Sequence, residues 1–135
     1  MQNSGDTRIA KDLVAASAIP LVLAILDEGE SYGYAILKRI DELSGGALGW
    51  TDGMLYPLLH RLERLGYLEG RWDSPEGGRR RRYYRITPAG RAALSEQRRQ
   101  WEVVSDALRN AWRSLDVASP TPLTRATQSA SGSSA

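Results

Sequence analysis

The sequence contains no cysteine, a single histidine and no apolar run long enough to cross a bilayer. Without cysteine the protein can form neither a disulfide framework nor a thiolate metal site. One histidine, His60, excludes a metal cluster that is built on several histidines. A membrane-spanning helix needs about 20 apolar residues, and the start of the chain lacks the basic segment and apolar core of a signal peptide. We therefore expect a soluble cytoplasmic protein without a membrane partner.

Catalytic motifs are also scarce. The sequence has no glycine-rich phosphate loop of the P-loop or dinucleotide kind, and no cluster of carboxylates. His60 and Glu63 are three residues apart and could pair on a helix, but no nucleophile accompanies them. The prediction is a protein that is not an enzyme and that needs no cofactor and no metal ion.

Basic side chains are unevenly distributed along the 135 residues, a length typical of one domain. Residues 1–50 carry 4 basic and 7 acidic side chains, whereas residues 51–86 carry 8 basic and 5 acidic ones. Four consecutive arginines, Arg79 to Arg82, form the densest cluster. Arginine suits bidentate contacts with phosphate and guanine, so this cluster indicates a nucleic-acid partner.

The first half of the chain is predicted to contain two helices. The first runs from Arg8 to Leu26, and its segment Ile19 to Leu26 is apolar on nearly every side, so the fold or a second subunit must bury it. Pro20 is expected to start a new helix or to kink this one. The second helix is expected over residues 32–43, with the hydroxyl of Ser31 as its N-cap.

A third helix follows the glycine-rich linker at 44–50, in which Leu48 and Trp50 could form a short strand. Thr51 is the expected N-cap, and the helix is expected to stop at Gly66. Its single apolar face consists of leucines at three- and four-residue spacing: Leu55, Leu58, Leu59, Leu62 and Leu65.

Two short strands, Tyr67 to Trp72 and Arg81 to Ile86, are predicted to form a hairpin, because the residues between them are turn formers. Alternation along the second strand places Arg80 and Arg82 on one face, and Arg79 and Arg81 on the other. A helix that can enter a groove, followed by a basic hairpin that can lie against phosphates, predicts a winged helix-turn-helix. The expected partner is double-stranded DNA.

The last helix is predicted to start with Thr87 as N-cap and Pro88 in its first turn, and to reach about Leu115. Its apolar residues follow heptad spacing for two repeats, which is typical of a helix that packs on another helix. This predicts a dimer interface of Trp101, Val104, Leu108, Ala111 and Leu115. Trp101 is expected either to pack in that interface or to wall a cavity for flat aromatic effectors.

The residues predicted to contact DNA lie in three places: the start of the second helix, the outer surface of the third helix and the hairpin. In a helix-turn-helix the N-terminal part of the recognition helix meets base edges. The side chain of Tyr32 is expected either to accompany a phosphate or to fill the core. Taken alone, the third helix could be an ordinary surface helix, and the arginine cluster a solvated turn. The candidates are Tyr32, Thr51, Gly53, Met54, Tyr56, Pro57, His60, Arg61, Arg79, Arg80, Arg81 and Arg82.

In the order and spacing of these motifs, the chain closely resembles the PadR-like transcriptional regulators over about 110 residues. The matching segments are LVLAIL, SYGYAI at 31–36, MLYPLLHRLERLGYL at 54–68 and GGRRRRYYRITPAGRAAL at 77–94. The resemblance implies a mostly α fold with a small β-hairpin wing. Its parts would be a winged-helix DNA-binding domain at 8–86 and a long C-terminal dimerisation helix at 87–116. Residues 1–7 and 117–135 are expected to be disordered.

The resemblance also implies a function. Members of the family mostly repress transcription, bind inverted repeats as homodimers and release them when a small, often aromatic or drug-like effector binds near the dimer interface. Trp101 falls where some multidrug-responsive members place a ligand-stacking tryptophan. Three alternatives remain open: a MarR-like regulator, a winged helix that serves as a protein-interaction module without DNA binding, and a dimer that only sequesters ligands.

Overall fold

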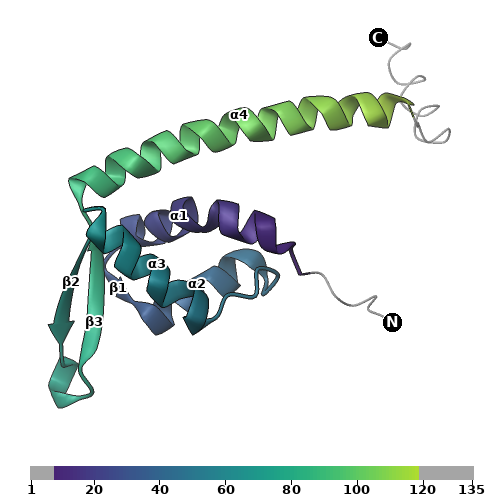
Figure 1. Cartoon of the computed structure of the whole chain (residues 1–135). Helices are drawn as coiled ribbons and strands as arrows, with labels where there is room; N and C mark the ends of the chain where they lie inside the picture. Colours follow the sequence, from purple (N-terminus) through teal and green to yellow (C-terminus); the bar gives the residue numbers. More distant parts are fainter. Residues whose placement is uncertain (1–7, 119–135) are drawn as a thin grey trace, which may run out of the picture. The chain divides into compact units, whose positions relative to one another are not determined.

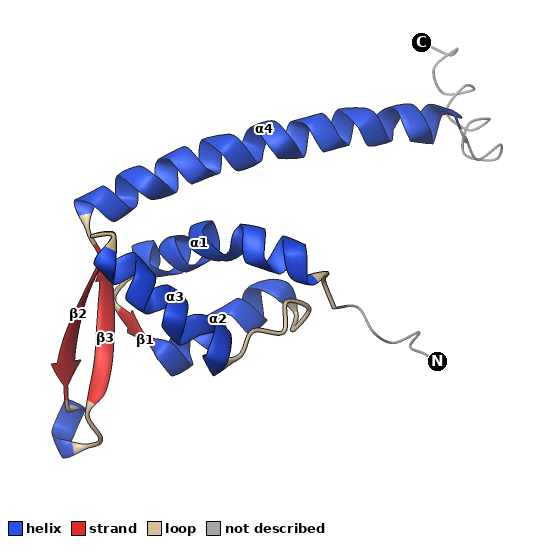
Figure 2. Cartoon of the chain, viewed as in Figure 1, coloured by secondary structure: helices blue, strands red, loops and turns tan. Residues whose placement is uncertain are grey.

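A computed structural model of the chain describes residues 8–118. The predicted disordered segments lie outside these residues, except for Val117 and Ala118, which extend the last helix beyond its predicted end. The elements follow one another as α1 (Lys11–Glu28), β1 (Ser31–Tyr32), α2 (Gly33–Ser44), α3 (Asp52–Arg64), β2 (Leu68–Asp73), the 3₁₀ turn η1 (Pro75–Gly77), β3 (Arg81–Ile86) and α4 (Pro88–Ala118). The predicted fold class, mostly helical with a small hairpin, is confirmed (Figures 1 and 2).

The chain divides into two compact units, Met1–Arg98 and Arg99–Ala135. Helix α4 starts in the first unit and continues into the second. The side chain of Leu94, in the first turns of α4, is buried in the core of the first unit. The division of the chain into a DNA-binding domain at 8–86 and a dimerisation helix at 87–116 stays a prediction.

One hydrophobic core holds the first unit together, and α1, α2, α3, the start of α4 and the sheet contribute to it. Burying one leucine or isoleucine side chain stabilises a fold by about 1.5–3 kcal/mol. Helices α1 and α3 each contain a proline, Pro20 and Pro57, which disfavours a helix. The several buried side chains of each helix outweigh this cost. The core consists of Val14, Val22, Leu23, Ile25, Leu26, Ile36, Ile40, Trp50, Leu55, Leu59, Leu62, Leu68, Tyr84, Ile86 and Leu94.

Pro20 lies inside α1, which runs through it as a single helix. The expectation that a new helix starts at Pro20 was therefore wrong. A proline inside a helix costs about 3 kcal/mol, because it removes one hydrogen bond and its ring crowds the preceding turn. The segment after Pro20 buries Val22, Leu23, Ile25 and Leu26, and this burial exceeds the cost.

A third strand lies before α2, where the sequence predicted only a helix cap. Ser31 pairs with Tyr84 and Tyr32 with Tyr83, so β1 forms an edge of an antiparallel sheet in the order β1-β3-β2. Helix α2 starts at Gly33, and the expected N-cap at Ser31 was wrong. The strand expected at Leu48 and Trp50 was also wrong, because residues 45–50 form turns and a loop.

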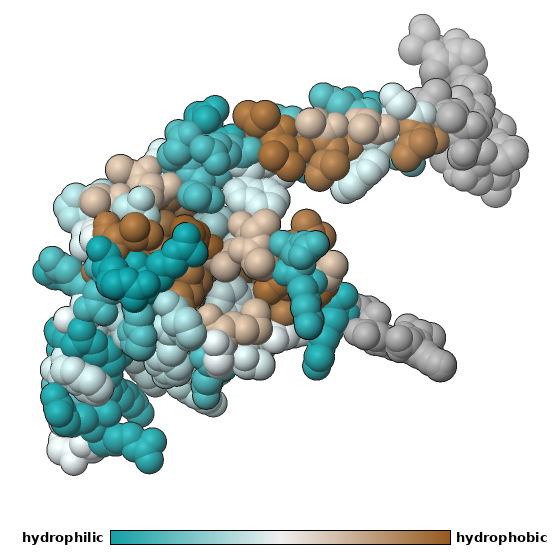
Figure 3. Space-filling model, viewed as in Figure 1, coloured by the Kyte–Doolittle hydropathy of each residue, from teal (hydrophilic) through white to brown (hydrophobic). Residues whose placement is uncertain are grey.

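The hairpin of β2 and β3 has the predicted arrangement. Its register pairs Leu68 with Ile86, Gly70 with Tyr84, and Trp72 with Arg82, so these six positions share one face of the sheet. Near the base of the hairpin this face is buried, since Leu68, Tyr84 and Ile86 belong to the core. Towards the hairpin turn the same face becomes exposed, since Trp72 and Arg80 are exposed. Hydrophilic residues gather over the hairpin (Figure 3).

Two of the three predicted cap residues, Thr51 and Thr87, stand where their helices begin. Thr51 occupies the N-cap position of α3, although among residues 8–118 its hydroxyl makes no hydrogen bond to the helix. Thr87 is a working cap, because the Gly90 N–H donates to its Oγ1 at 3.0 Å. The Thr87 hydroxyl also donates to the carbonyl oxygen of Gly66 at 2.6 Å. This bond ties the start of α4 to the end of α3.

Candidate nucleic-acid interface

Helix α3 presents one exposed side to solvent. An α-helix turns by about 100° per residue, so the direction opposite the buried leucines can be assigned from the sequence. The residues nearest to that direction are all exposed: Gly53, Pro57, His60, Arg61 and Arg64. Four of them were predicted to contact DNA. Arg64 was not, although the same helical period places it in the centre of this side.

One flank of the exposed side borders α1. Met54, Pro57 and Arg61 line a cleft of about 630 Å³ together with Val14 of α1 and Trp50, besides other residues of the first unit. Met54 keeps 39% of its surface exposed, so it is shared between this cleft and the outer surface. Thr51 is exposed at the start of the helix.

The other flank of α3 borders the start of α2. The side chain of Tyr56 packs so closely against Gly33 that a Cβ at this glycine would overlap the tyrosine hydroxyl. Tyr56 remains 38% exposed. Tyr34 is 69% exposed and therefore does not fill the core.

Tyr32 lies on the sheet surface, half-buried, and is not in the core cluster. Its ring meets the ring of Tyr83 edge to face, with 5.4 Å between the centroids. The guanidinium of Arg81 stacks over the Tyr32 ring at 4.4 Å. Tyr32 and Arg81, which were predicted separately as DNA contacts, are therefore neighbours on one face of the sheet.

Arg80 and Arg82 lie on the opposite face, as alternation predicted. Arg80 and Arg82 both stack on the ring of Trp72, at 4.6 Å and 5.5 Å from its centroid. Arg82 also forms an ion pair with Glu63 of α3, with 2.7 Å between Nη2 and Oε2. Arg79 is exposed at the end of the hairpin turn.

Glu63 and Trp72 contact arginines of the wing, and sequence reasoning predicted neither contact. Glu63 was considered only as a partner of His60, and Trp72 only as one residue of a strand. The alternation of the hairpin placed Trp72 beside Arg82, so that signal was available. The pairing of Arg82 with a residue of α3 depends on how the sheet packs on the helix.

Burial raises the pKa of the Tyr84 phenol, which lies next to Arg82 on the same face of the sheet.

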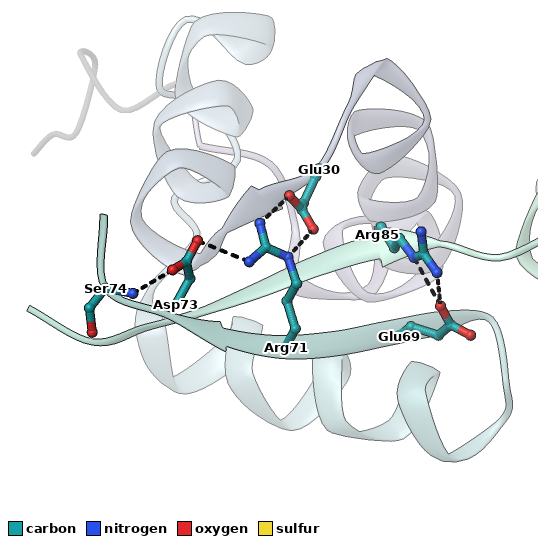
Figure 4. A network of polar contacts seen from close by, with 6 residues as sticks. All are labelled: Glu30, Glu69, Arg71, Asp73, Ser74 and Arg85. Atoms are coloured by element: carbon teal, nitrogen blue, oxygen red, sulfur yellow. Dashed lines mark hydrogen bonds and ion pairs between the residues drawn. The ribbon is translucent and has the colours of Figure 1, made fainter. Parts of the chain in front are cut away.

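A network of charges spans the face of the sheet that carries Tyr83 (Figure 4). Arg71 of β2 donates two hydrogen bonds to Glu30, at 2.8 and 2.7 Å, and a third to Asp73 at 3.0 Å. These bonds hold the pKa values of Glu30 and Asp73 below their ordinary values, and the same carboxylates raise the pKa of Arg71. Because β3 lies between β1 and β2, the bond from Arg71 to Glu30 bridges the whole width of the sheet.

Among residues 8–118, none of the helices has the length and hydropathy needed to span a membrane. Helix α3 packs on α2, exposes one side, and is tied by Arg82 to a basic hairpin. These features define a winged helix-turn-helix DNA-binding protein. Residues 22–96 match the transcriptional regulator PadR-like family, and the chain belongs to this family. It is accordingly a DNA-binding transcriptional regulator and not an enzyme, and the match decides against the MarR-like alternative.

Individual relatives agree with this assignment. The transcriptional regulator Rv3488 of Mycobacterium tuberculosis is 52% identical over 61 residues, which are 45% of this chain and 56% of that protein. A solved structure of a transcriptional regulator from Clostridium thermocellum has a TM-score of 0.68 and 30% identity, and covers 74% of this chain and 97% of its own. The solved structure of a PadR-like transcriptional regulator from Bacillus cereus has a TM-score of 0.67 and 26% sequence identity. The match covers 76% of this chain and 97% of that chain.

Proposed function

We propose that the protein is a repressor that binds a palindromic operator as a homodimer and leaves it when a small aromatic or drug-like effector binds. A regulator that acts on operator DNA works where the DNA is, which in a bacterium is the cytoplasm. The observation that carries the proposal is the ion pair between Arg82 and Glu63, because it joins the basic wing directly to the recognition helix.

In the proposed complex the exposed side of α3 enters the major groove. Met54 and Thr51 lie near the start of the helix, where base edges are met, and both can contact thymine methyl groups. His60 and Arg61 reach bases or phosphates further along. Gly53 lets the helix approach the DNA closely, because its Cβ position is open apart from Thr51 Oγ1 at 3.8 Å.

The remaining predicted contacts lie beside α3. The hydroxyl of Tyr56 and the ring of Tyr32 flank the start of α2, where unpaired backbone N–H groups and the helix dipole favour a phosphate. Arg79 and Arg81 carry positive charge from the hairpin to the DNA backbone. Pro57 adds a rigid apolar surface in the centre of the exposed side of α3.

Dimerisation is proposed through the part of α4 that belongs to the second unit. Hydrophobic side chains gather along α4 (Figure 3), and Val104, Leu108 and Leu115 keep 46%, 42% and 64% of their surface exposed. With Ala111 and the half-buried Trp101 they repeat every three and four residues. A second copy related by two-fold symmetry would cover this seam and place two recognition helices about 10 bp apart, or a multiple of that.

The effector is the least constrained part of the proposal. Trp101 offers a flat ring in the seam, and two symmetry-related copies would wall an apolar site. An effector acts only if it binds one arrangement of the dimer more tightly than the other. It would therefore favour a dimer whose recognition helices are spaced incorrectly for the operator.

A salt-titrated binding assay tests the proposed function. Purified protein is titrated against the DNA upstream of its own gene, with scrambled DNA of equal length as control. We expect tight binding to a palindrome and a steep fall with salt, of about 0.9 log units per decade for each phosphate neutralised. Arg80→Ala combined with Arg81→Ala should lower the affinity and flatten the slope. Failure to bind any DNA at low salt would favour a protein-interaction module or a ligand-sequestering dimer.

A further inference from the structure

Trp72 is a large aromatic residue that the fold of the hairpin does not need for its core. The core residues of the hairpin are Leu68, Tyr84 and Ile86, at its base. Trp72 lies further along the same face and keeps 55% of its surface exposed. Its position in β2, opposite Arg82, fixes the face of the sheet on which the ring lies.

Two guanidinium groups hold the indole ring. The Cζ of Arg80 lies 4.6 Å from the ring centroid, and that of Arg82 lies 5.5 Å from it. Stacking of a cation on an exposed tryptophan is favourable by about 0.5–1 kcal/mol. The ring therefore restricts the side chain of Arg80, which would otherwise sample many rotamers at an exposed position.

Arg82 differs from Arg80 because it is anchored at its far end. Its guanidinium bonds Glu63 of α3 and passes over Gly70, where a Cβ would lie 2.7 Å from Arg82 Cζ. Glycine at position 70 thus leaves the room that Arg82 needs to reach α3. A continuous line of contacts runs from Glu63 through Arg82 and Trp72 to Arg80.

The charges along this line are divided unequally. The charge of Arg82 is compensated by the Glu63 carboxylate, and both side chains are about 70% buried, with 28% and 31% exposed. Arg80 is exposed. Within residues 8–118 its guanidinium contacts the indole ring of Trp72 and no carboxylate. The exposed end of the line therefore presents an uncompensated cation beside an exposed aromatic edge.

We propose that Trp72 is a DNA-contacting residue, which enters the minor groove together with Arg80, while Arg82 positions Trp72 and does not itself touch DNA. Minor-groove binding commonly combines arginine with an apolar wedge. A narrow minor groove carries an enhanced negative potential, which attracts an arginine that is already oriented. This inference rests on the proposed DNA binding by α3 and the wing, and it assigns the wing contact to specific residues.

The test compares Trp72→Ala, Arg80→Ala and the double variant with wild type, against the operator or against random duplex at low salt. We expect Trp72→Ala to weaken binding by about tenfold, because the wedge is lost and Arg80 is released. The double variant should lose less than the product of the two single losses, since the two side chains act as one unit. Trp72→Phe, which keeps a flat ring, should retain most of the affinity.

Two further measurements decide between explanations. Arg80→Ala should lower the salt slope by about 0.9, whereas Trp72→Ala should change it less, because no charge is removed. A minor-groove ligand such as netropsin should compete with wild-type protein more strongly than with Trp72→Ala. Thermal unfolding of each variant checks that the fold is intact.

The outcomes separate this inference from the proposed function. Wild-type affinity of Trp72→Ala at every salt concentration would overturn the inference, and so would additive losses or equal competition by netropsin. In each of these cases wild-type protein still binds DNA and the proposed function stands. If wild-type protein binds no duplex at all, the proposed function fails first.

Discussion

Arg82 of the wing and Glu63 of the recognition helix form an ion pair with 2.7 Å between Nη2 and Oε2. The two residues are 19 positions apart in the sequence. Helix α3 and strand β3 are also joined through the buried core, and this pair adds a polar contact between them. A DNA duplex that binds both elements meets them in this relative arrangement.

The first prediction concerns this pair. Glu63→Gln should reduce the free energy of unfolding by about 1 kcal/mol or less, because both side chains are partly solvated. Affinity for DNA should fall by a larger factor than the stability change implies, since the wing is no longer fixed relative to α3. Chemical denaturation and the salt-titrated binding assay measure the two effects separately.

Arg82→Gln is the matched variant on the other side of the pair. A positioning role predicts that it weakens binding without a full loss of 0.9 in the salt slope, which a direct phosphate contact would produce. Two results together would contradict the positioning role. The salt slope of DNA binding would fall by about 0.9 in Arg82→Gln, and Glu63→Gln would bind DNA with wild-type affinity.

The second prediction concerns Gly90, in the first turn of α4. A Cβ at this position would overlap the backbone carbonyl oxygen of Tyr67 and also meet Ile86. Backbone cannot move aside as a side chain can, so Gly90→Ala should destabilise the fold by about 1–3 kcal/mol. Thermal or chemical denaturation measures the loss.

Gly53→Ala is the control for this substitution. Gly53 lies in the first turn of α3, and its Cβ position is open except for Thr51 Oγ1 at 3.8 Å. Because alanine is the better helix former by about 1 kcal/mol, this variant should be as stable as wild type or slightly more stable. Equal destabilisation by both variants would show that the contact with Tyr67 is not the cause.

Local signals in the sequence predicted the elements that depend on neighbouring residues. The bounds of β3 were correct because the turn formers before Arg81 and the cap at Thr87 both act within a few positions. The β1 strand at Ser31 and Tyr32 was missed, because two residues carry no periodicity and their partners, Tyr84 and Tyr83, lie about 50 positions away.

At the candidate site, too, features set by neighbouring residues were predicted, whereas contacts between residues far apart in the sequence were not. The exposed side of α3 follows from helical period alone, which is why most of its residues were among the candidates. The bonds from Arg82 to Glu63 and from Arg71 to Glu30 depend on how the sheet packs, over separations of 19 and 41 residues. At Pro20 the expected start of a new helix did not occur, because burial of the following segment outweighed the proline cost.

The third prediction tests the dimer seam with two adjacent valines. Val104 lies in the seam, whereas Val103 lies about 100° further round α4, and both are exposed, at 46% and 58%. Val104→Glu should shift the protein from dimer to monomer, because two charges would meet across the two-fold axis. Val103→Glu should leave the dimer intact. Sedimentation equilibrium over a range of concentrations measures both.

Loss of DNA binding should accompany the loss of the dimer. If Val104→Glu remains dimeric, or if both variants dissociate equally, the seam at 101–115 is not the interface. A monomeric Val104→Glu that still binds the operator with wild-type affinity would contradict the need for two recognition helices.

The fourth prediction concerns pH and the network around Arg71. Hydrogen bonds from Arg71 lower the pKa of Glu30 below its ordinary value of 4.5, and Arg71 with the Ser74 N–H lowers that of Asp73 below 3.8. In the folded state both carboxyls therefore bind protons less readily than in the unfolded chain. Their contribution to stability is complete above about pH 5 and is lost as the pH falls through the lowered values.

Glu30→Gln removes the main partner of Arg71 and should lower the midpoint of thermal unfolding at pH 7. The difference from wild type should shrink as the pH falls through the lowered pKa of Glu30, because the wild-type carboxyl then takes up a proton as well. Glu76→Gln, in the exposed hairpin turn, removes the same charge outside the network and serves as the control. A Glu30→Gln difference that stays constant from pH 7 to pH 3 would mean that the bridge across the sheet does not stabilise the fold through its charge.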